Sequence, residues 1–164
     1  MTNLLPALGL GIVSGMRSMM GLAFLSDKVH DATGETNPAL ALLKLPQTAL
    51  LLKVMGTGEA IFDKTPFIPA RTAALPLIGR AVCGAFVGAA VSKKYWREGA
   101  VVGAIGAIGS TYAAYTIRKA LQDEAHIPNV VLGFVEDTMA ASIAHRIVDQ
   151  AVIQPSEDVQ PVIA

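Results

Sequence analysis

Two arginines and several carboxylates interrupt the apolar stretches of this sequence. Arg17 lies within the first stretch, Arg80 in the middle of a later one, and the adjacent acids Glu136 and Asp137 within the last. An ionised side chain at the centre of a membrane helix costs about 2.5 to 3.5 kcal/mol on insertion scales, so such residues face one another or water and not lipid. Depth alone therefore predicts a network in which the two arginines bind these two acids and Glu59.

A second acidic pair lies nearer the end of an apolar segment. Glu59 and Asp63 are four residues apart, so a helix would place both carboxylates on one face, with Lys64 adjacent. That face could hold a cation or bind an arginine, and we expect it at the mouth of the segment. Glu136 and Asp137 differ from this pair, because adjacent side chains diverge by about 100° around a helix and do not readily chelate one ion together.

Composition indicates that the elements carrying these charges are membrane helices. The 164 residues are 52% hydrophobic and 16% charged, with a mean hydropathy of +0.49. A soluble domain carries roughly 25% charged residues and needs a polar outer face on each helix, whereas the charges here cluster at segment ends. We therefore expect lipid, not water, around most of the chain.

Five apolar segments follow from a pass along the chain. The first, residues 3–26, is about 24 residues or roughly 36 Å long as a helix, enough to cross a bilayer core of about 30 Å. It has no basic residue before the apolar run and carries Arg17 inside it, so we expect a retained helix and not a secretory signal. The others are residues 38–62, 72–92, 99–117 and 127–148.

The second segment is the least regular. Lys44, Pro46 and Lys53 interrupt it, and Pro46 is expected to divide it into a short interfacial helix and a second helix. Whether it spans fully stays open, as does the orientation of the chain, because basic residues divide almost evenly between the two sides. The sequence thus predicts an all-α polytopic bundle of four to five transmembrane helices. Residues 1–150 form a single domain, and the polar tail 151–164 is expected to be disordered.

Glycines recur at helix-packing spacing in three segments. In lipid, close backbone approach at small residues supplies the packing that burial of apolar surface cannot. We expect these glycines to form helix-contact faces, either within the chain or between copies in a homo-oligomer. They are Gly11, Gly15, Gly84, Gly88, Gly99, Gly103, Gly106 and Gly109.

A weak internal similarity suggests that the chain has two related halves. A Gly-rich segment followed by an acidic one occurs at residues 9–15 and 56–59, and again at residues 99–109 and 133–136. Two such helix hairpins flanking a central span would suit an inverted repeat. Inverted repeats with a polar site at their interface are a recurrent transporter plan.

Four short motifs together resemble a known family. They are Gly15-Met16-Arg17-Ser18, Gly58-Glu59-Ala60-Ile61-Phe62-Asp63-Lys64-Thr65-Pro66, Gly79-Arg80, and Val135-Glu136-Asp137. The pattern G-x-R, E-x-x-x-D-K-x-P, G-R and E-D is similar to that of the bacterial family called domain of unknown function 4126. The resemblance implies a multi-pass protein of the bacterial inner membrane. It implies no activity, and it singles out the same charged positions as the depth argument.

Other function classes receive little support. Lys plus Arg equals Asp plus Glu at 13 each, and the sequence has no basic stripe interleaved with aromatic residues. Nucleic-acid binding is therefore not expected. The single Cys83 excludes an intrachain disulfide and a cysteine-cluster metal site. No metalloprotease, nucleophile-elbow or phosphate-loop motif occurs, so an enzyme is not expected, and the sequence defines no cofactor and no metal ligands.

Two functions stay open at this point. The first is a small transporter or channel in which Glu59, Asp63, Glu136 and Asp137 line a path for a cation, a proton or a small solute, with Lys64 beside them. Arg17 and Arg80 would balance charge or gate that path. The second is a structural or assembly protein that holds a lipid, a pigment or a partner subunit, with the charges as inter-helix locks.

Overall fold

The computed structural model describes residues 4–29, 37–62, 73–125 and 127–153, and the regular structure within these ranges is entirely helical. This confirms the all-α class. The elements are α1 (Leu5–Met16), α2 (Met20–Val29), α3 (Pro38–Leu43), α4 (Pro46–Phe62), α5 (Ala74–Val91), the short 3-10 helix η1 (Lys93–Tyr95), α6 (Trp96–Asp123) and α7 (Asn129–Ile153).

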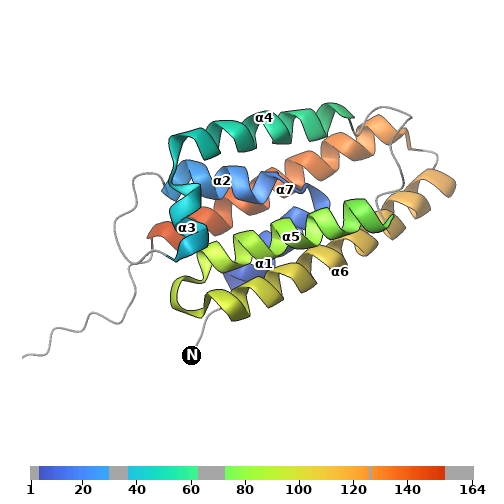
Figure 1. Cartoon of the computed structure of the whole chain (residues 1–164). Coiled ribbons are helices and arrows are strands. Elements are labelled where there is room, and N and C mark those ends of the chain that lie inside the picture. Colours follow the sequence, from blue (N-terminus) through green and yellow to red (C-terminus); the bar gives the residue numbers. More distant parts are fainter. Residues whose placement is uncertain (1–3, 30–36, 63–72, 126, 154–164) are drawn as a thin grey trace, which may run out of the picture.

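The helices form a bundle around α1. This helix packs against α5, α6 and α7, and α5 and α6 form the most extensive pair, joined by η1. In Figure 1, α4 lies along one side of the bundle, α5 and α6 lie along the opposite side, and α2 and α7 run between them. α3 packs on α5 and leads into α4, which rests mainly on α2.

The first apolar segment is not the single spanning helix that the sequence predicts. It is divided into α1 and α2, and the backbone at Arg17 between them is extended. The two helices fold back beside each other, since an added Cβ at Gly21 in α2 would lie near Leu10 and Ser14 of α1. We call α1 and α2 the hairpin and residues 17–19 its tip.

The second segment divides at Pro46 as predicted. α3 ends at Leu43, and α4 begins at Pro46, where a missing backbone N–H is tolerated in a first helical turn. Asn37 caps α3 by accepting a hydrogen bond from the N–H of Leu40. Its side-chain amide also donates to the carbonyl oxygen of Ala89 in α5 at 2.7 Å, so a single buried residue fixes both the start and the position of α3.

The other boundaries differ modestly from those predicted. α6 extends six residues past the apolar stretch that ends at residue 117, and α7 continues to Ile153, beyond the predicted domain end at residue 150. α2 continues to Val29, into the predicted polar loop. Each extension adds polar or charged turns that can lie outside an apolar layer. Residues 154–164 of the predicted tail lie outside the described residues.

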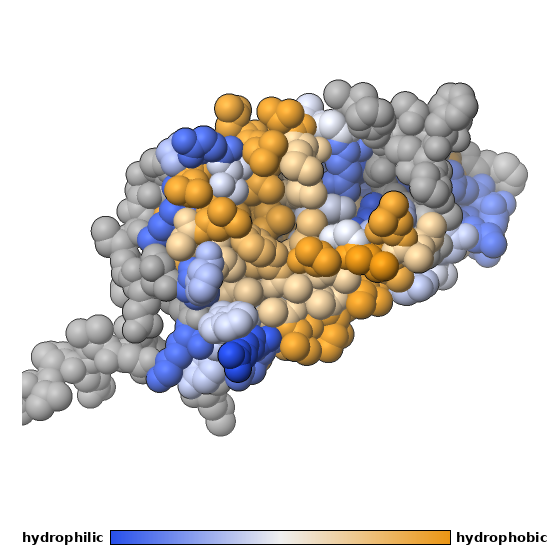
Figure 2. All heavy atoms as spheres, in the orientation of Figure 1, coloured by the Kyte–Doolittle hydropathy of each residue, from blue (hydrophilic) through white to orange (hydrophobic). Residues whose placement is uncertain are grey.

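Two helices, α5 and α6, are long and apolar enough to cross a membrane by length and composition, and α1 is a shorter apolar helix. The surface of the described residues agrees with an apolar environment. Large aliphatic side chains such as Leu75, Val101 and Ile105 are at least 60% exposed. Figure 2 shows a broad hydrophobic band across the visible face, with hydrophilic residues toward both ends of the bundle.

Glycines lie at the closest helix contacts. An added Cβ at Gly88 in α5 would overlap the backbone of Gly99 in α6, and one at Gly103 would overlap Gly84. Gly11, Gly15 and Gly106 occupy similar contacts between α1 and α6. Gly109 does not, because an added Cβ there would meet no atom within 4 Å, so this member of the predicted set lies away from the helix contacts.

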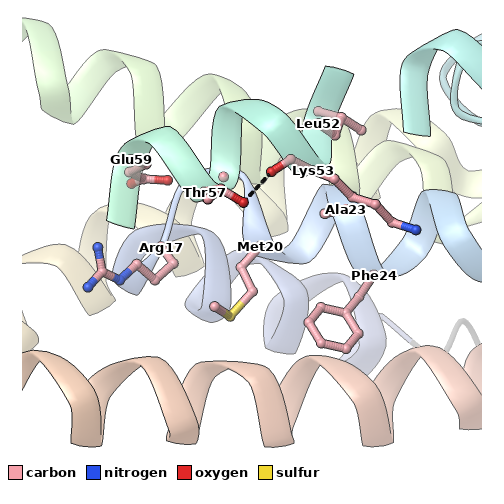
Figure 3. A pocket seen from close by; sticks show the side chains of 9 residues that line it. Arg17, Met20, Ala23, Phe24, Leu52, Lys53, Thr57 and Glu59 are labelled. Carbon is pink, nitrogen blue, oxygen red and sulfur yellow. Dashed lines mark hydrogen bonds between the residues drawn. The ribbon is translucent and has the colours of Figure 1, made fainter. Parts of the chain in front are cut away.

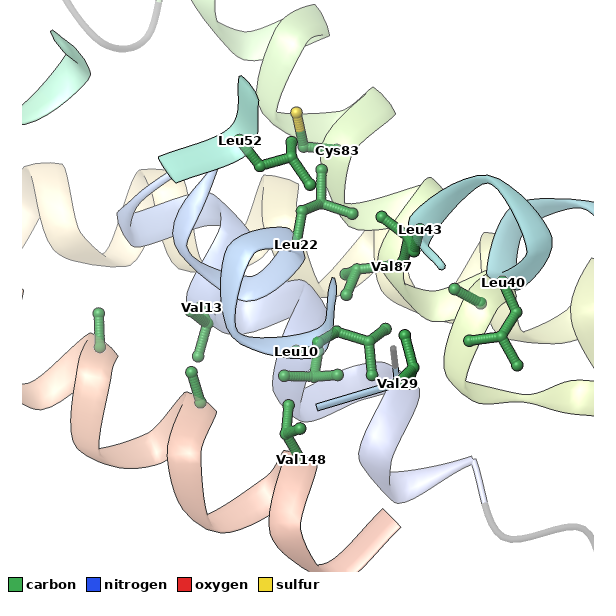
Figure 4. Packing of buried hydrophobic residues seen from close by; sticks show 14 residues of the cluster. Leu10, Val13, Leu22, Val29, Leu40, Leu43, Leu52, Cys83, Val87 and Val148 are labelled. Carbon is green, nitrogen blue, oxygen red and sulfur yellow. The ribbon is translucent and has the colours of Figure 1, made fainter. Parts of the chain in front are cut away.

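The apolar core joins the hairpin to every helix except α6. Its fully buried members include Leu10 and Val13 of α1, with Leu25 of α2 beside them. Figure 4 shows side chains of this core, such as Leu10, Cys83 and Val148, converging from helices that are distant in the sequence. The rest of the cluster is Leu22, Val29, Leu40, Leu43, Leu52, Cys83, Val87, Ala90, Ala140, Ala144 and Val148.

Candidate functional site

The tip of the hairpin carries a buried ion pair. The guanidinium of Arg17 donates a short hydrogen bond from Nε to the Oδ1 atom of Asp137 in α7. The side chain of Arg17 is 4% exposed and that of Asp137 is 22% exposed. A buried arginine needs such a partner, because an unpaired charge in a weakly polar environment is strongly unfavourable.

The carboxylate of Glu59 binds the start of α2. Its Oε1 atom accepts a hydrogen bond from the N–H of Ser18 at 3.0 Å, and its Oε2 atom accepts one from the N–H of Met19 at 3.2 Å. These amides precede the first turn of α2, where backbone N–H groups lack helical partners and favour a negative charge. Glu59 lies in the last turn of α4, and its side chain reaches the hairpin tip and is 18% exposed.

The end of α1 is held in the same way by donors from α5 and α6. The carbonyl oxygen of Gly15 accepts hydrogen bonds from Nη1 of Arg80 at 2.6 Å and from the hydroxyl of Thr111 at 3.1 Å. Nη2 of Arg80 also lies 3.9 Å from the Glu59 carboxylate. The polar backbone groups released by the break in the helix are thus bound by side chains of α4, α5 and α6.

The third arginine–carboxylate contact involves a residue that the sequence does not single out. Nη2 of Arg118 in α6 donates a 2.5 Å hydrogen bond to Oε2 of Glu136 in α7. The sequence predicts Arg17 or Arg80 as the partner of Glu136 and does not indicate Arg118. Arg118 directly follows a stretch of 19 uncharged residues, so the sequence predicts that its side chain extends into water at the end of the span.

The charged network consists of three arginines and three carboxylates from four helices and the hairpin tip: Arg17, Glu59, Arg80, Arg118, Glu136 and Asp137. Five of the seven residues predicted as site candidates belong to it. The other two, Asp63 and Lys64, lie outside the described residues. The formal charges of the network sum to zero. Glu59 and Glu136, the acidic residues that occupy equivalent positions in the two weakly similar halves, are both among its members.

A cleft of about 350 Å³ opens between α2 and α4 on one side of the tip. We call it the α2–α4 cleft. Arg17 and Glu59 lie at its inner end, and Lys53 lies farther along α4. Figure 3 shows Met20 and Phe24 extending from α2 toward α7. The complete lining is Arg17, Met20, Ala23, Phe24, Leu52, Lys53, Gly56, Thr57 and Glu59.

A second, smaller cleft of about 160 Å³ lies between α6 and α7, and we call it the α6–α7 cleft. Its charged lining residues are Arg118 and Glu136, and Met16, next to Arg17 in the chain, closes it toward the hairpin. The complete lining is Met16, Ala114, Ile117, Arg118, Leu121, Leu132, Val135, Glu136 and Met139.

The two clefts approach the network from opposite ends of the bundle. The α2–α4 cleft extends from Glu59 back along α4 to Leu52, toward the end where α4 begins. The α6–α7 cleft extends toward the end where α6 finishes and α7 starts, because Leu121 and Leu132 line it. Met16 lines the α6–α7 cleft and Arg17 lines the α2–α4 cleft, so two consecutive residues separate the two linings.

Comparison with known proteins gives a family and no activity. A sequence profile described as "Domain of unknown function (DUF4126)" matches residues 4–152 of this chain. The chain belongs to the DUF4126 family. The resemblance that the four motifs predict is thereby confirmed at the level of the family. No curated protein and no solved structure gives a match.

For this DUF4126 chain, the candidate site therefore rests on its own geometry. Among the described residues, no group of three or more His, Cys, Asp or Glu side chains could hold a metal ion. The arrangement offers ion pairs that can exchange partners and a short non-helical segment held between several helices. Such an arrangement can bind a charged or polar group, or it can lock helices together.

Proposed function

We propose that this DUF4126 chain is a small multi-pass transporter of the bacterial inner membrane, moving a small solute past the charged network. The membrane assignment is supported by two helices long and apolar enough to span and by many large exposed aliphatic side chains. Soluble monomers rarely expose apolar patches beyond a few hundred Å². In a membrane the same surface would face lipid.

The single observation that carries the transport proposal is the interrupted hairpin. Non-helical backbone at membrane depth is tolerated where protein buries it or where it lines a cavity. Transporters place such interruptions at their substrate sites, with the ends of short helices directed at charged groups. Here Glu59 meets the start of α2, and Arg80 meets the end of α1.

The two clefts supply the access routes that the proposal needs. Transport by alternating access requires a site that is reached from one side at a time. The network lies between clefts that extend toward opposite ends of the bundle, and consecutive residues, Met16 and Arg17, separate them. A change of partners by Arg17 and Arg118 would open one cleft to the network while the other stays closed.

A structural role is the second candidate, favoured by the ion pairs themselves. Each of the three carboxylates of the network binds an arginine or a backbone amide of another helix. Such pairs could serve only to fix helix positions. In that case neutral substitutions would lower stability and assembly without altering any flux.

Flux measurements in proteoliposomes separate the two candidates. The purified chain is reconstituted, and uptake of a panel of ions, organic acids, amines and amphiphiles is compared with that of protein-free vesicles. Transport predicts uptake of at least one class of solute, with loss of that uptake in Glu59→Gln and Glu136→Gln proteins that still fold. Circular dichroism and size-exclusion chromatography verify that these variants are folded.

Lys119→Gln serves as a charge control outside the network and outside both clefts. Protein-dependent uptake that the Glu59→Gln and Glu136→Gln variants retain would contradict the role of the network. Absence of uptake for every class, together with destabilised network variants, would favour the structural role.

A further inference from the structure

The walls of the α2–α4 cleft restrict what can occupy it. Between its charged inner end and Lys53, the lining consists of aliphatic, aromatic and small side chains, including Met20, Phe24 and Leu52. The hydroxyl in this stretch, that of Thr57, donates to the carbonyl oxygen of Lys53, so these walls offer too few oxygen ligands to replace the water shell of an inorganic cation. They favour an apolar body, because removing apolar surface from water is worth about 25 cal/mol per Å².

The size of the cleft suits one short chain. A volume of about 350 Å³ lies at the lower end of the roughly 300–1,000 Å³ typical of small-molecule sites. A two-chain lipid would exceed it. A single hydrocarbon chain can lie along Phe24 and Leu52 with its head at the outer part of the cleft.

Lys53 supplies a cation for the head of such a molecule. Its ammonium forms a 2.6 Å ion pair with Asp27 of α2, and the two side chains are 54% and 59% exposed. Exposed pairs of this kind contribute only about 0–1 kcal/mol, so an incoming anion can replace Asp27 at little cost. Arg17, at the inner end, is buried against Asp137, so replacing that partner by an incoming anion would cost more.

We infer that the α2–α4 cleft binds a single-chain amphipathic anion, with its hydrocarbon chain against Phe24 and Leu52 and its anionic head at Lys53. Such a molecule is also the substrate class of the transporter, and this second statement rests on the proposed function. Binding itself is measured without any flux, so the two can fail separately.

Photolabelling tests the site in the intact protein. The chain is placed in phosphatidylcholine nanodiscs, labelled with a diazirine analogue of decanoate, and mapped by peptide mass spectrometry. The label is expected on residues 20–24 and 52–57, and decanesulfonate is expected to compete while acetate does not. Label spread evenly over the lipid-facing surfaces of α5 and α6 would overturn the inference.

Four variants, two of them controls, test the site further. Ala23→Trp fills the cleft and should abolish the cleft label, whereas Ala113→Trp on the exposed face of α6 should not. Lys53→Gln should weaken competition by decanesulfonate about fivefold, equivalent to roughly 1 kcal/mol, and leave competition by decanol unchanged. Lys119→Gln should change neither.

Equal effects of Lys53→Gln on decanesulfonate and decanol would overturn the assignment of an anionic head. Cleft labelling with no decanesulfonate flux in proteoliposomes would overturn the substrate assignment and leave the binding site standing. Flux of another solute class, with no label in the cleft, would overturn the site and leave the proposed transport function standing.

Discussion

Arg17 and Asp137 are separated by 120 positions in the sequence and form an ion pair at the tip of the hairpin. This contact joins the first interrupted segment to the last helix and fixes the depth of the tip within the bundle. Because Arg17 is buried, the negative charge of Asp137 stabilises it. The pair is therefore the first place to test whether the network stabilises the fold.

Removal of either partner should destabilise the protein more than removal of both. Asp137→Asn is expected to lower the free energy of unfolding by about 3 to 5 kcal/mol, because it removes the negative charge of the carboxylate that the buried Arg17 guanidinium binds. The double variant Arg17→Gln, Asp137→Asn should recover a large part of that loss. Thermal unfolding in mild detergent measures both. A double variant that loses the sum of the two single losses would contradict this coupling.

Arg118 and Lys119 should respond differently to the same substitution. Arg118→Gln removes the 2.5 Å hydrogen bond to Glu136, and a charged hydrogen bond of this kind contributes about 1.5 to 3 kcal/mol. Lys119 is exposed, so Lys119→Gln should change the unfolding free energy by less than about 0.5 kcal/mol. Equal unfolding temperatures for the two variants would show that Arg118 makes no stabilising contact.

Glycines at helix contacts should be intolerant of a methyl group. An alanine at position 103 would overlap the carbonyl of Gly84, so Gly103→Ala is expected to cost about 1 to 3 kcal/mol of unfolding free energy. Gly109→Ala is the matched control, because open space surrounds that position and alanine favours a helix by up to about 1 kcal/mol. Chemical denaturation of both variants would measure the difference. If Gly103→Ala proved as stable as Gly109→Ala, the close approach of α5 and α6 would be wrong.

The pair formed by Lys28 and Asp149 predicts a pH dependence. Asp149 lies one residue past the last predicted span, and its hydrogen bond with Lys28 lowers the pKa of its carboxyl group from 3.8. A lowered pKa contributes stability above about pH 3.8 that is lost as the pH falls below it.

Lys28→Gln should therefore reduce the unfolding free energy slightly near neutral pH and leave it unchanged in strong acid. Unfolding curves collected from neutral to acidic pH would reveal this. A difference between variant and parent that persisted in strong acid would assign the stabilisation to contacts other than this pair.

Several features could be predicted because single residues determine them. Pro46 cannot supply a hydrogen bond within a helix, so the break between α3 and α4 follows directly from the sequence. Arg17 and Asp137 were expected to find opposite charges because an apolar environment penalises each of them alone. The structure supplies these partners.

Other features depend on contacts that the local sequence does not contain. Residues 3–26 have the length and composition of a span, and no proline marks the break at the tip. The break is stabilised by Glu59, Arg80 and Thr111, which lie 40 to 96 positions away from their partners at the tip. Arg118 was missed for the same reason, because its position after an apolar stretch does not indicate that Glu136 lies beside it.

In the proposed transporter, the charged network lies between access routes from opposite sides of the membrane, and each cleft is reached from one side. Cys83 is the only cysteine, so Cys83→Ser gives a background in which single cysteines can be placed. Ala23→Cys reports on the α2–α4 cleft, Ala114→Cys on the α6–α7 cleft, and the exposed Ala113→Cys is the control.

The decisive measurement is the reaction of these cysteines in sealed vesicles with a membrane-impermeant thiol reagent, added outside or trapped inside. We expect the cysteines at positions 23 and 114 to react from opposite sides, whereas the one at position 113 reacts from neither side. Reaction of both cleft cysteines from the same side, or of neither from any side, would contradict the proposed access routes.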